Sequence, residues 1–204
     1  MATDEPNYRT YVEALHGDWF RTQSEPYTFR MGRPNRPTHE AQFTLVWGYC
    51  CHVHMVARAY LAAVDAAPAI AATPPARMIY QTALTAHRIA QSPEGHRGLG
   101  NEEIRQRSQL VTTLTKTSVN KVFQASAAQI NYAALSDRIE SESDAAARNF
   151  AQLCNDLQPG GAEDAYTIHR VMSMESHPSV VIADQWLEAP TDEDGPPKLR
   201  SVPR

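Results

Sequence analysis

The sequence predicts an all-α protein: a single-domain bundle of six to eight helices with a disordered C-terminal tail. Apolar residues recur at helical rather than alternating spacing in nearly every segment. Clusters of proline and glycine separate segments of helical length. The 204 residues are 42% hydrophobic and 21% charged, which is ordinary for one globular domain with its own core. We therefore expect a helical domain over residues 1–187 and a disordered Pro- and Asp-rich tail over residues 188–204.

Three helices are expected in the N-terminal half. Residues 8–21 carry an amphipathic stripe. After an irregular segment rich in proline and arginine, Thr38 is expected to N-cap a long helix over residues 39–66. This helix is apolar on both sides, so we place it at the centre of the bundle. The third helix is expected from Pro75, a favourable first helical residue, to Gln91.

The C-terminal half continues the helical pattern. Glycines at positions 95, 98 and 100 are expected to break the chain before a fourth helix, with Asn101 as its N-cap and Glu102 and Glu103 in its first turn. Helical periodicity then covers residues 119–130, 133–157, 163–176 and 180–187. The run 178–183 is a weak strand signal.

Charge and hydropathy limit the compartment and the partners. The formal net charge of −4 gives no global basic excess to hold nucleic acid, so an RNA or DNA role would need a local patch. The acidic N-terminal residues do not resemble a signal peptide. Asp65 and Pro68 interrupt the longest apolar stretch well short of the roughly 20 residues that span a bilayer. We expect a cytoplasmic protein without a membrane segment.

The most informative candidate site lies near the end of the chain. Arg170, Ser173, Ser176 and His177 fall on the last two turns of a predicted helix, and Pro178 disfavours helical geometry at the residue before it. An arginine, two hydroxyls and an imidazole at a helix end suit ligand capture or acid–base chemistry. No single reaction is specified by this pattern.

A second candidate lies on the predicted third helix. Arg77, Gln81, Leu84 and Arg88 follow a 4-3-4 spacing, with His87 on the adjoining edge. Two arginines on one helical face can hold a phosphate or a carboxylate. A solvated stripe, or partial burial against acidic partners, is the structural alternative. Together the two segments give Arg77, His87, Arg88 and Ser173 as candidate ligand-binding residues.

The run around Cys50 and His54 raises the question of a metal. These two residues are four apart and share a helical face, but a structural zinc site needs four ligands and no second pair follows. Packing in the core is favoured, so we predict no metal and no cofactor. A bundle that stores a metal or an apolar ligand near these residues remains a third hypothesis.

Several of these segments resemble an uncharacterised bacterial helical family, the domain of unknown function number 5677. The similarity rests on the helix that begins near Arg77, on a helix containing Arg105 and Arg107, and on a late pattern of Tyr166, Ser173 and His177. It covers about residues 41–186. Where the family pattern has glutamate, this chain has Gln81. The resemblance implies a bacterial all-α protein and carries no activity with it.

A weaker similarity links one motif to HEPN-type ribonucleases. The spacing Arg-x6-His occurs at Arg9 and His16 and again at Arg170 and His177. In that family the arginine holds a phosphate and the histidine acts as acid or base, in sites that a dimer brings together. Here Arg170 is followed by Val171 rather than by a polar residue. The resemblance implies catalytic roles for Arg170 and His177 and an RNA partner.

Two functional hypotheses follow. The leading one is a binding or regulatory protein in which Arg77, Arg88, Arg170 and His177 converge on one polar pocket, because ionisable groups on buried helices need partners. The alternative is a metal-independent ribonuclease that uses Arg170 and His177. The sequence does not specify the ligand, the partner or the oligomeric state.

Overall fold

The computed structural model describes residues 8–23, 37–92, 95–116, 119–130, 148–160, 162–177, 183, 185–188 and 198–200. Within these residues it contains seven α-helices, which confirms the all-α prediction. The α-helices are α1 (Tyr8–Gln23), α2 (Pro37–Ala66), α3 (Thr73–Gln91), α4 (Gly95–Lys116), α5 (Lys121–Ala128), α8 (Phe150–Leu157) and α9 (Ala165–Ser176). Two 3-10 helices, Ala69–Ala72 and Gln158–Gly160, and the strands β1 (Leu187–Glu188) and β2 (Lys198–Leu199) complete the described elements.

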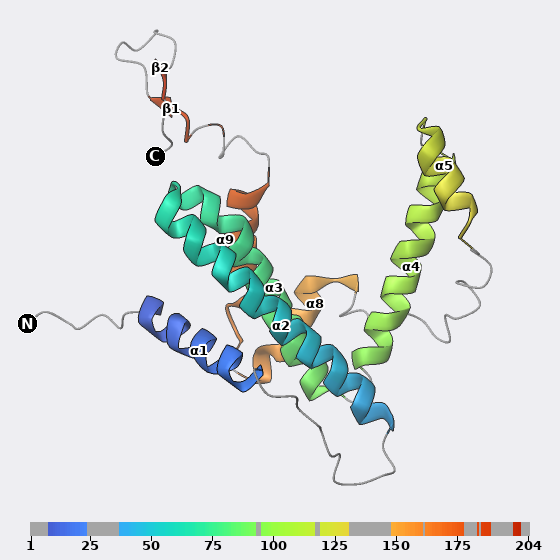
Figure 1. The fold of residues 1–204 in the computed structure, drawn as a ribbon, viewed down its shortest axis with the longest axis horizontal. Coiled ribbons are helices and arrows are strands. Elements are labelled where there is room, and N and C mark those ends of the chain that lie inside the picture. Colours follow the sequence, from blue (N-terminus) through green and yellow to red (C-terminus); the bar gives the residue numbers. More distant parts are fainter. Residues whose placement is uncertain are drawn as a thin grey trace, which may run out of the picture.

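The two long helices α2 and α3 form an antiparallel hairpin at the centre of the molecule (Figure 1). Only residues 67–72 connect them, so they lie against each other along most of their length. Gln42, near the start of α2, donates from its side-chain amide to the carbonyl oxygens of Ile89 and Ala90 at 2.6 and 3.1 Å. These contacts satisfy carbonyls that the end of α3 leaves open and fix how the two helices align.

The core lies where α8 and α9 pack on α3 (Figure 1). Leu157 is fully buried, and Leu153 and Cys154 beside it are 5% and 1% exposed. Leu84 from α3 and Phe150 from α8 pack against this centre. Helix α1 lies beside α2, where the ring of Trp19 contacts that of Trp47 (Figure 1).

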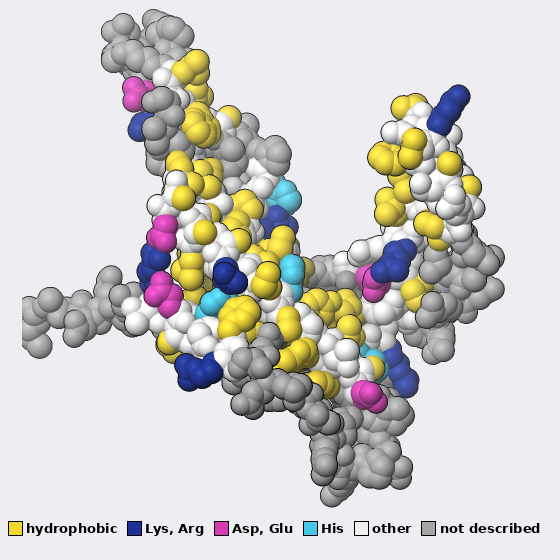
Figure 2. All heavy atoms as spheres, in the orientation of Figure 1, with side chains coloured by type: hydrophobic (Ala, Val, Ile, Leu, Met, Phe, Trp, Pro, Cys, Tyr) yellow, Lys and Arg dark blue, Asp and Glu magenta, His cyan; other side chains and the backbone are white. Residues whose placement is uncertain are grey.

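Helices α4 and α5 form an arm that extends away from the hairpin (Figure 1). Helix α5 packs against α4 and is capped by Asn120, whose side-chain oxygen accepts from the Val122 backbone N–H at 2.9 Å. Hydrophobic side chains are exposed along this arm (Figure 2). They are Leu110, Val119, Val122, Phe123 and Ile130.

Two predicted helix starts are wrong. Helix α4 begins at Gly95 rather than at Asn101, which is a buried residue inside the helix. A Cβ atom on Gly95 would lie 3.1 Å from Cβ of Ser92 and 3.4 Å from Cα of Ile89, so the glycine permits a close approach to the end of α3 instead of breaking the chain. Helix α2 begins at Pro37, which puts Thr38 in the first turn.

The predicted C-terminal elements are only partly described. Most of residues 188–204, where a disordered tail was expected, lies outside the described residues, and so do residues 180–182 and 184, half of the predicted helix over residues 180–187. The described part contains β1 and β2, which pair in antiparallel register with Leu187 opposite Leu199. Among the helices that the structure describes, none combines the length and the apolar character needed to cross a membrane.

Candidate functional site

Six polar side chains meet where α9 packs on α3, and we call them the α3–α9 site. They are Arg77 and Gln81 from α3, and His169, Ser173, Ser176 and His177 from α9 and its C-cap. Residues four apart on a helix share a face, so the spacing on each helix turns these side chains toward the other. A polar seam therefore runs between the two helices.

His177 is the C-cap of α9 and leaves the helix. Its backbone is extended, with φ −102° and ψ 146°, as expected before Pro178, and its N–H donates to the Ser173 carbonyl at 3.2 Å. The Arg77 guanidinium donates from Nη1 to His177 Nε2 at 2.5 Å and to Ser176 Oγ at 3.1 Å. An arginine N–H can only donate, so Nε2 accepts in this contact and the ring's other nitrogen, Nδ1, is the one that carries a proton.

Arg77 is a half-buried cation that no described carboxylate pairs with. Its hydrogen-bond partners are the neutral groups of Ser176 and His177, and within the described part of the chain its buried Nε has no partner. Arg88, on the same helix, differs because its Nε donates to Asp156 Oδ2 at 3.0 Å. A cation removed from water is costly unless a counter-charge stabilises it. Among the described residues, none therefore compensates the charge of Arg77.

His169 lies deepest in the site, at 9% exposure, and its ring contacts that of Phe150 with centroids 4.4 Å apart. Its Nε2 accepts from the Gln81 amide at 2.7 Å, while its buried Nδ1 has no partner among the described residues. Burial lowers the pKa of His169 most, and the positive charges of Arg77 and Arg170 lower it further. The ring is therefore neutral at neutral pH and adds no second positive charge beside Arg77.

The structure brings together three of the predicted site residues: Arg77, Ser173 and His177. Ser173 donates to the His169 carbonyl at 2.7 Å within α9. Arg88 does not join them, because it lies eleven residues further along α3, about 16 Å along the axis, and pairs with α8. Exposed His87 hydrogen-bonds Gln91 at 2.8 Å instead. The predicted convergence of four ionisable residues is therefore replaced by a smaller group.

Arg170 and His177, the catalytic pair that the ribonuclease hypothesis predicts, lie at the edge of this site. Arg170 is exposed on α9 and acts on the site through its charge. It is seven residues before His177, about 10 Å along the helix axis. The imidazole of His177 contacts Arg77 rather than a group on its own helix.

Sequence reasoning missed His169. The signal that could have found it is the four-residue spacing of His169, Ser173 and His177, which predicts one face of α9. Gln81 was noted for its place in the spacing of the third helix and as a departure from a family pattern, but it was not predicted to be a site residue. Its amide is the hydrogen-bond donor to His169, and a glutamate there could not donate in the same way when ionised.

Among the described residues, the region around Cys50 and His54 holds no cluster of metal ligands. Burial raises the pKa of the Cys50 thiol, which disfavours the thiolate that a metal would need. His54 stacks on Trp19 of α1, with ring centroids 4.6 Å apart. Within the described ranges no group of three or more His, Cys, Asp or Glu side chains could hold a metal ion.

Comparison with known proteins adds no relative: no family model matches the chain, and no curated protein or solved structure matches it significantly. The resemblance to the domain of unknown function number 5677, and the similarity of one motif to HEPN-type ribonucleases, therefore stay predictions.

Proposed function

We propose that this chain is a binding protein that recognises an anionic group, a carboxylate or a phosphate, at the α3–α9 site. One observation carries the proposal: Arg77 is half-buried, its buried Nε has no partner, and no described carboxylate compensates its charge. An anion would supply the missing counter-charge and the missing acceptor together. Arginine suits this role because its planar donors match the oxygens of both groups.

The neighbouring groups favour the same ligand charge. His177 is exposed and its Nδ1 carries a proton while Nε2 accepts from Arg77, so the ring offers a second donor. The hydroxyl of Ser176 is a third group that can donate. Arg170 adds a positive charge that already acts on His169. An anion there would meet donors and positive potential, whereas a cation would be repelled.

The test measures unfolding by urea in increasing inorganic phosphate, with sodium chloride added to keep the ionic strength equal. A ligand that binds only the folded state stabilises it by RT ln(1 + [L]/Kd), so specific binding gives a saturable gain. We expect this gain in the wild type and in Arg107→Met, a control on α4 whose guanidinium is exposed and pairs with Glu103. We expect it to vanish in Arg77→Met.

A gain of equal size in Arg77→Met would contradict the proposal, because phosphate also stabilises proteins by general exclusion from their surface. Arg77→Met could fail to fold. In that case Ser176→Ala and His177→Phe, which change the solvent-facing end of the site, should each weaken the phosphate effect, and an unchanged effect in both would refute the proposal.

The ribonuclease hypothesis makes a different prediction for the same residue. It requires RNA cleavage by the purified protein that is lost in His177→Ala and in Arg170→Ala. The binding proposal expects no cleavage by any of the three proteins. Cleavage of a labelled single-stranded RNA in metal-free buffer, lost in both variants, would favour the enzyme.

A further inference from the structure

A separate apolar cavity lies among α1, α2, α3 and α9 and opens to solvent, since Leu15 and Ile168 in its wall are 47% and 45% exposed. Its volume is about 420 Å³, within the range of roughly 300–1,000 Å³ typical of small-molecule sites. Its walls come from all four helices. The residues that matter below are Val12 and His16 of α1, His54 and Ala57 of α2, and Tyr80 and Ala83 of α3. None of these residues belongs to the α3–α9 site.

Aromatic rings surround one side of the cavity. His16 and His54 line it with ring centroids 5.6 Å apart. Trp19 stacks on His54 at 4.6 Å, with an angle of 11° between the ring planes, and Phe20 meets the edge of His16 at 4.6 Å. Flat rings at this spacing offer faces and edges on which another aromatic ring can pack.

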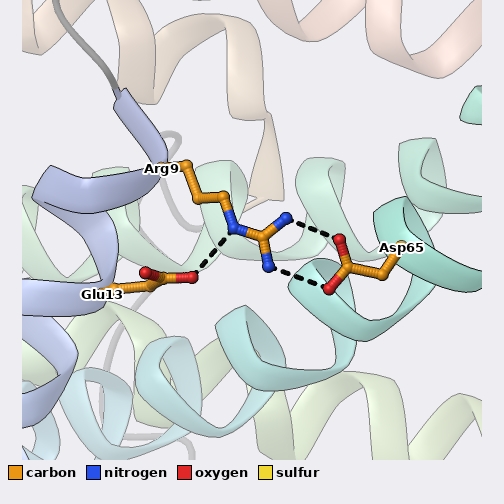
Figure 3. A network of polar contacts seen from close by, with 3 residues as sticks. All are labelled: Arg9, Glu13 and Asp65. Carbon is orange, nitrogen blue, oxygen red and sulfur yellow. Dashed lines mark hydrogen bonds and ion pairs between the residues drawn. The ribbon is translucent and has the colours of Figure 1, made fainter.

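Helix α1 forms the outer wall and is held in place by an ion pair. Arg9 donates from both terminal nitrogens to the carboxylate of Asp65 at the end of α2, at 2.5 and 2.8 Å, and from Nε to Glu13 at 2.9 Å (Figure 3). The pair joins α1 to α2 one turn from Val12, which lines the cavity. The Arg9–Asp65 ion pair thus attaches α1, the outer wall of the cavity, to the end of α2.

The lining residues include no Asp, Glu, Lys or Arg. The two imidazoles are neutral at neutral pH, because burial lowers the pKa of both His16 and His54. The positive charge of Arg58 lowers the pKa of His16 further, and His16 does the same to His54. Tyr80 already donates its hydroxyl to the Ala165 carbonyl at 3.1 Å. His16 Nδ1 is buried and has no partner among the described residues.

We infer that this cavity binds an uncharged aromatic molecule, with its rings among the four helices. Apolar walls without formal charge exclude ions because desolvation would be uncompensated. A cavity of roughly 150 Å³ in another protein holds benzene, so about 420 Å³ leaves room for two fused rings. The inference does not depend on the proposed anion site.

Isothermal titration calorimetry with 2-naphthol tests this inference. We expect one site per chain with Kd below 1 mM, and binding at least tenfold weaker for the cation 2-naphthylmethylammonium. Arg107→Met changes an exposed residue of α4 that does not line the cavity, and it should leave the affinity unchanged.

Cavity-filling variants provide the matched control. Ala57→Leu places extra carbon atoms in the cavity, whereas Ala62→Leu makes the same change at an exposed position of α2. We expect at least a tenfold loss of affinity in the first and none in the second. Ala83→Leu fills the cavity from α3 and serves if Ala57→Leu does not fold. No binding at 1 mM, equal binding of the cation, or full affinity in the filled variant would overturn the inference.

Discussion

The stability of this protein should fall as the pH falls from about 7.5 to 5.5, and His169 should be a main cause. The ring is 9% exposed, and burial, Arg77 and Arg170 all lower its pKa from the value of 6.5 for a free histidine. The unfolded chain therefore takes up a proton near pH 6.5, while the folded chain does not until the pH is lower. In that window the unfolded state binds more protons, so the free energy of unfolding decreases as the pH decreases.

The size of the effect follows from the number of protons. One histidine contributes at most about 1.4 kcal/mol per pH unit. The pKa values of His16 and His54 are lowered in the same direction, so all three together give an upper limit of roughly 4 kcal/mol per pH unit. His169 is the most buried of them. Against a typical total of about 5–15 kcal/mol, such a loss is easily measured.

Urea unfolding at half-unit steps of pH is the assay. His169→Gln keeps an amide that can hydrogen-bond Gln81 but removes the titrating ring, so the slope between pH 6.5 and 5.5 should drop by up to about 1.4 kcal/mol per pH unit. A wild-type stability that stays level or rises toward pH 5.5 would refute the reasoning. An unchanged slope in His169→Gln would show that His169 is not responsible.

Three further predictions concern the fold. Leu157→Ala should destabilise the protein by about 2–5 kcal/mol in chemical unfolding, because Leu157 is fully buried; a much smaller loss would mean that the core closes over the cavity. Gly48→Ala should stabilise α2 by up to about 1 kcal/mol, since nothing lies within 4 Å of its new Cβ. Gly95→Ala should destabilise the protein, because its Cβ would lie 3.1 Å from Cβ of Ser92. Equal effects of the two substitutions on the free energy of unfolding would contradict the packing described. Arg9→Gln should hardly change global stability, since its pair with Asp65 is exposed, but should speed hydrogen exchange in α1; unchanged exchange would mean that the pair does not hold α1.

Helix existence could be predicted from this sequence better than helix ends. Spacing of apolar residues identified α1, α2, α3 and α9 because a buried helical face imposes that spacing whatever the neighbours are. The start of α4 could not be found in this way. Gly95 looks like a breaker locally, and only the proximity of Ser92 explains why a glycine is needed within the helix.

The site could be predicted in part for a similar reason. The arginine on α3 and the histidine at the end of α9 were both identified, since each lies on a helix that also has an apolar face. Their contact joins residues 100 positions apart, which local spacing cannot reveal. Arg77 and Arg88 have similar local sequence settings, and only the tertiary structure shows that Asp156 compensates Arg88 and that no described carboxylate compensates Arg77.

The most direct test of the central claim is an NMR titration of the arginine Nε–H signals with inorganic phosphate. Arg77 and Arg88 serve as an internal pair on one helix, because the Nε of Arg77 lacks a partner in the described structure and that of Arg88 donates to Asp156. We predict that the Arg77 signal moves saturably as phosphate binds while the Arg88 signal stays in place. If the Arg77 signal does not move, or both move together without saturation, the site does not bind anions.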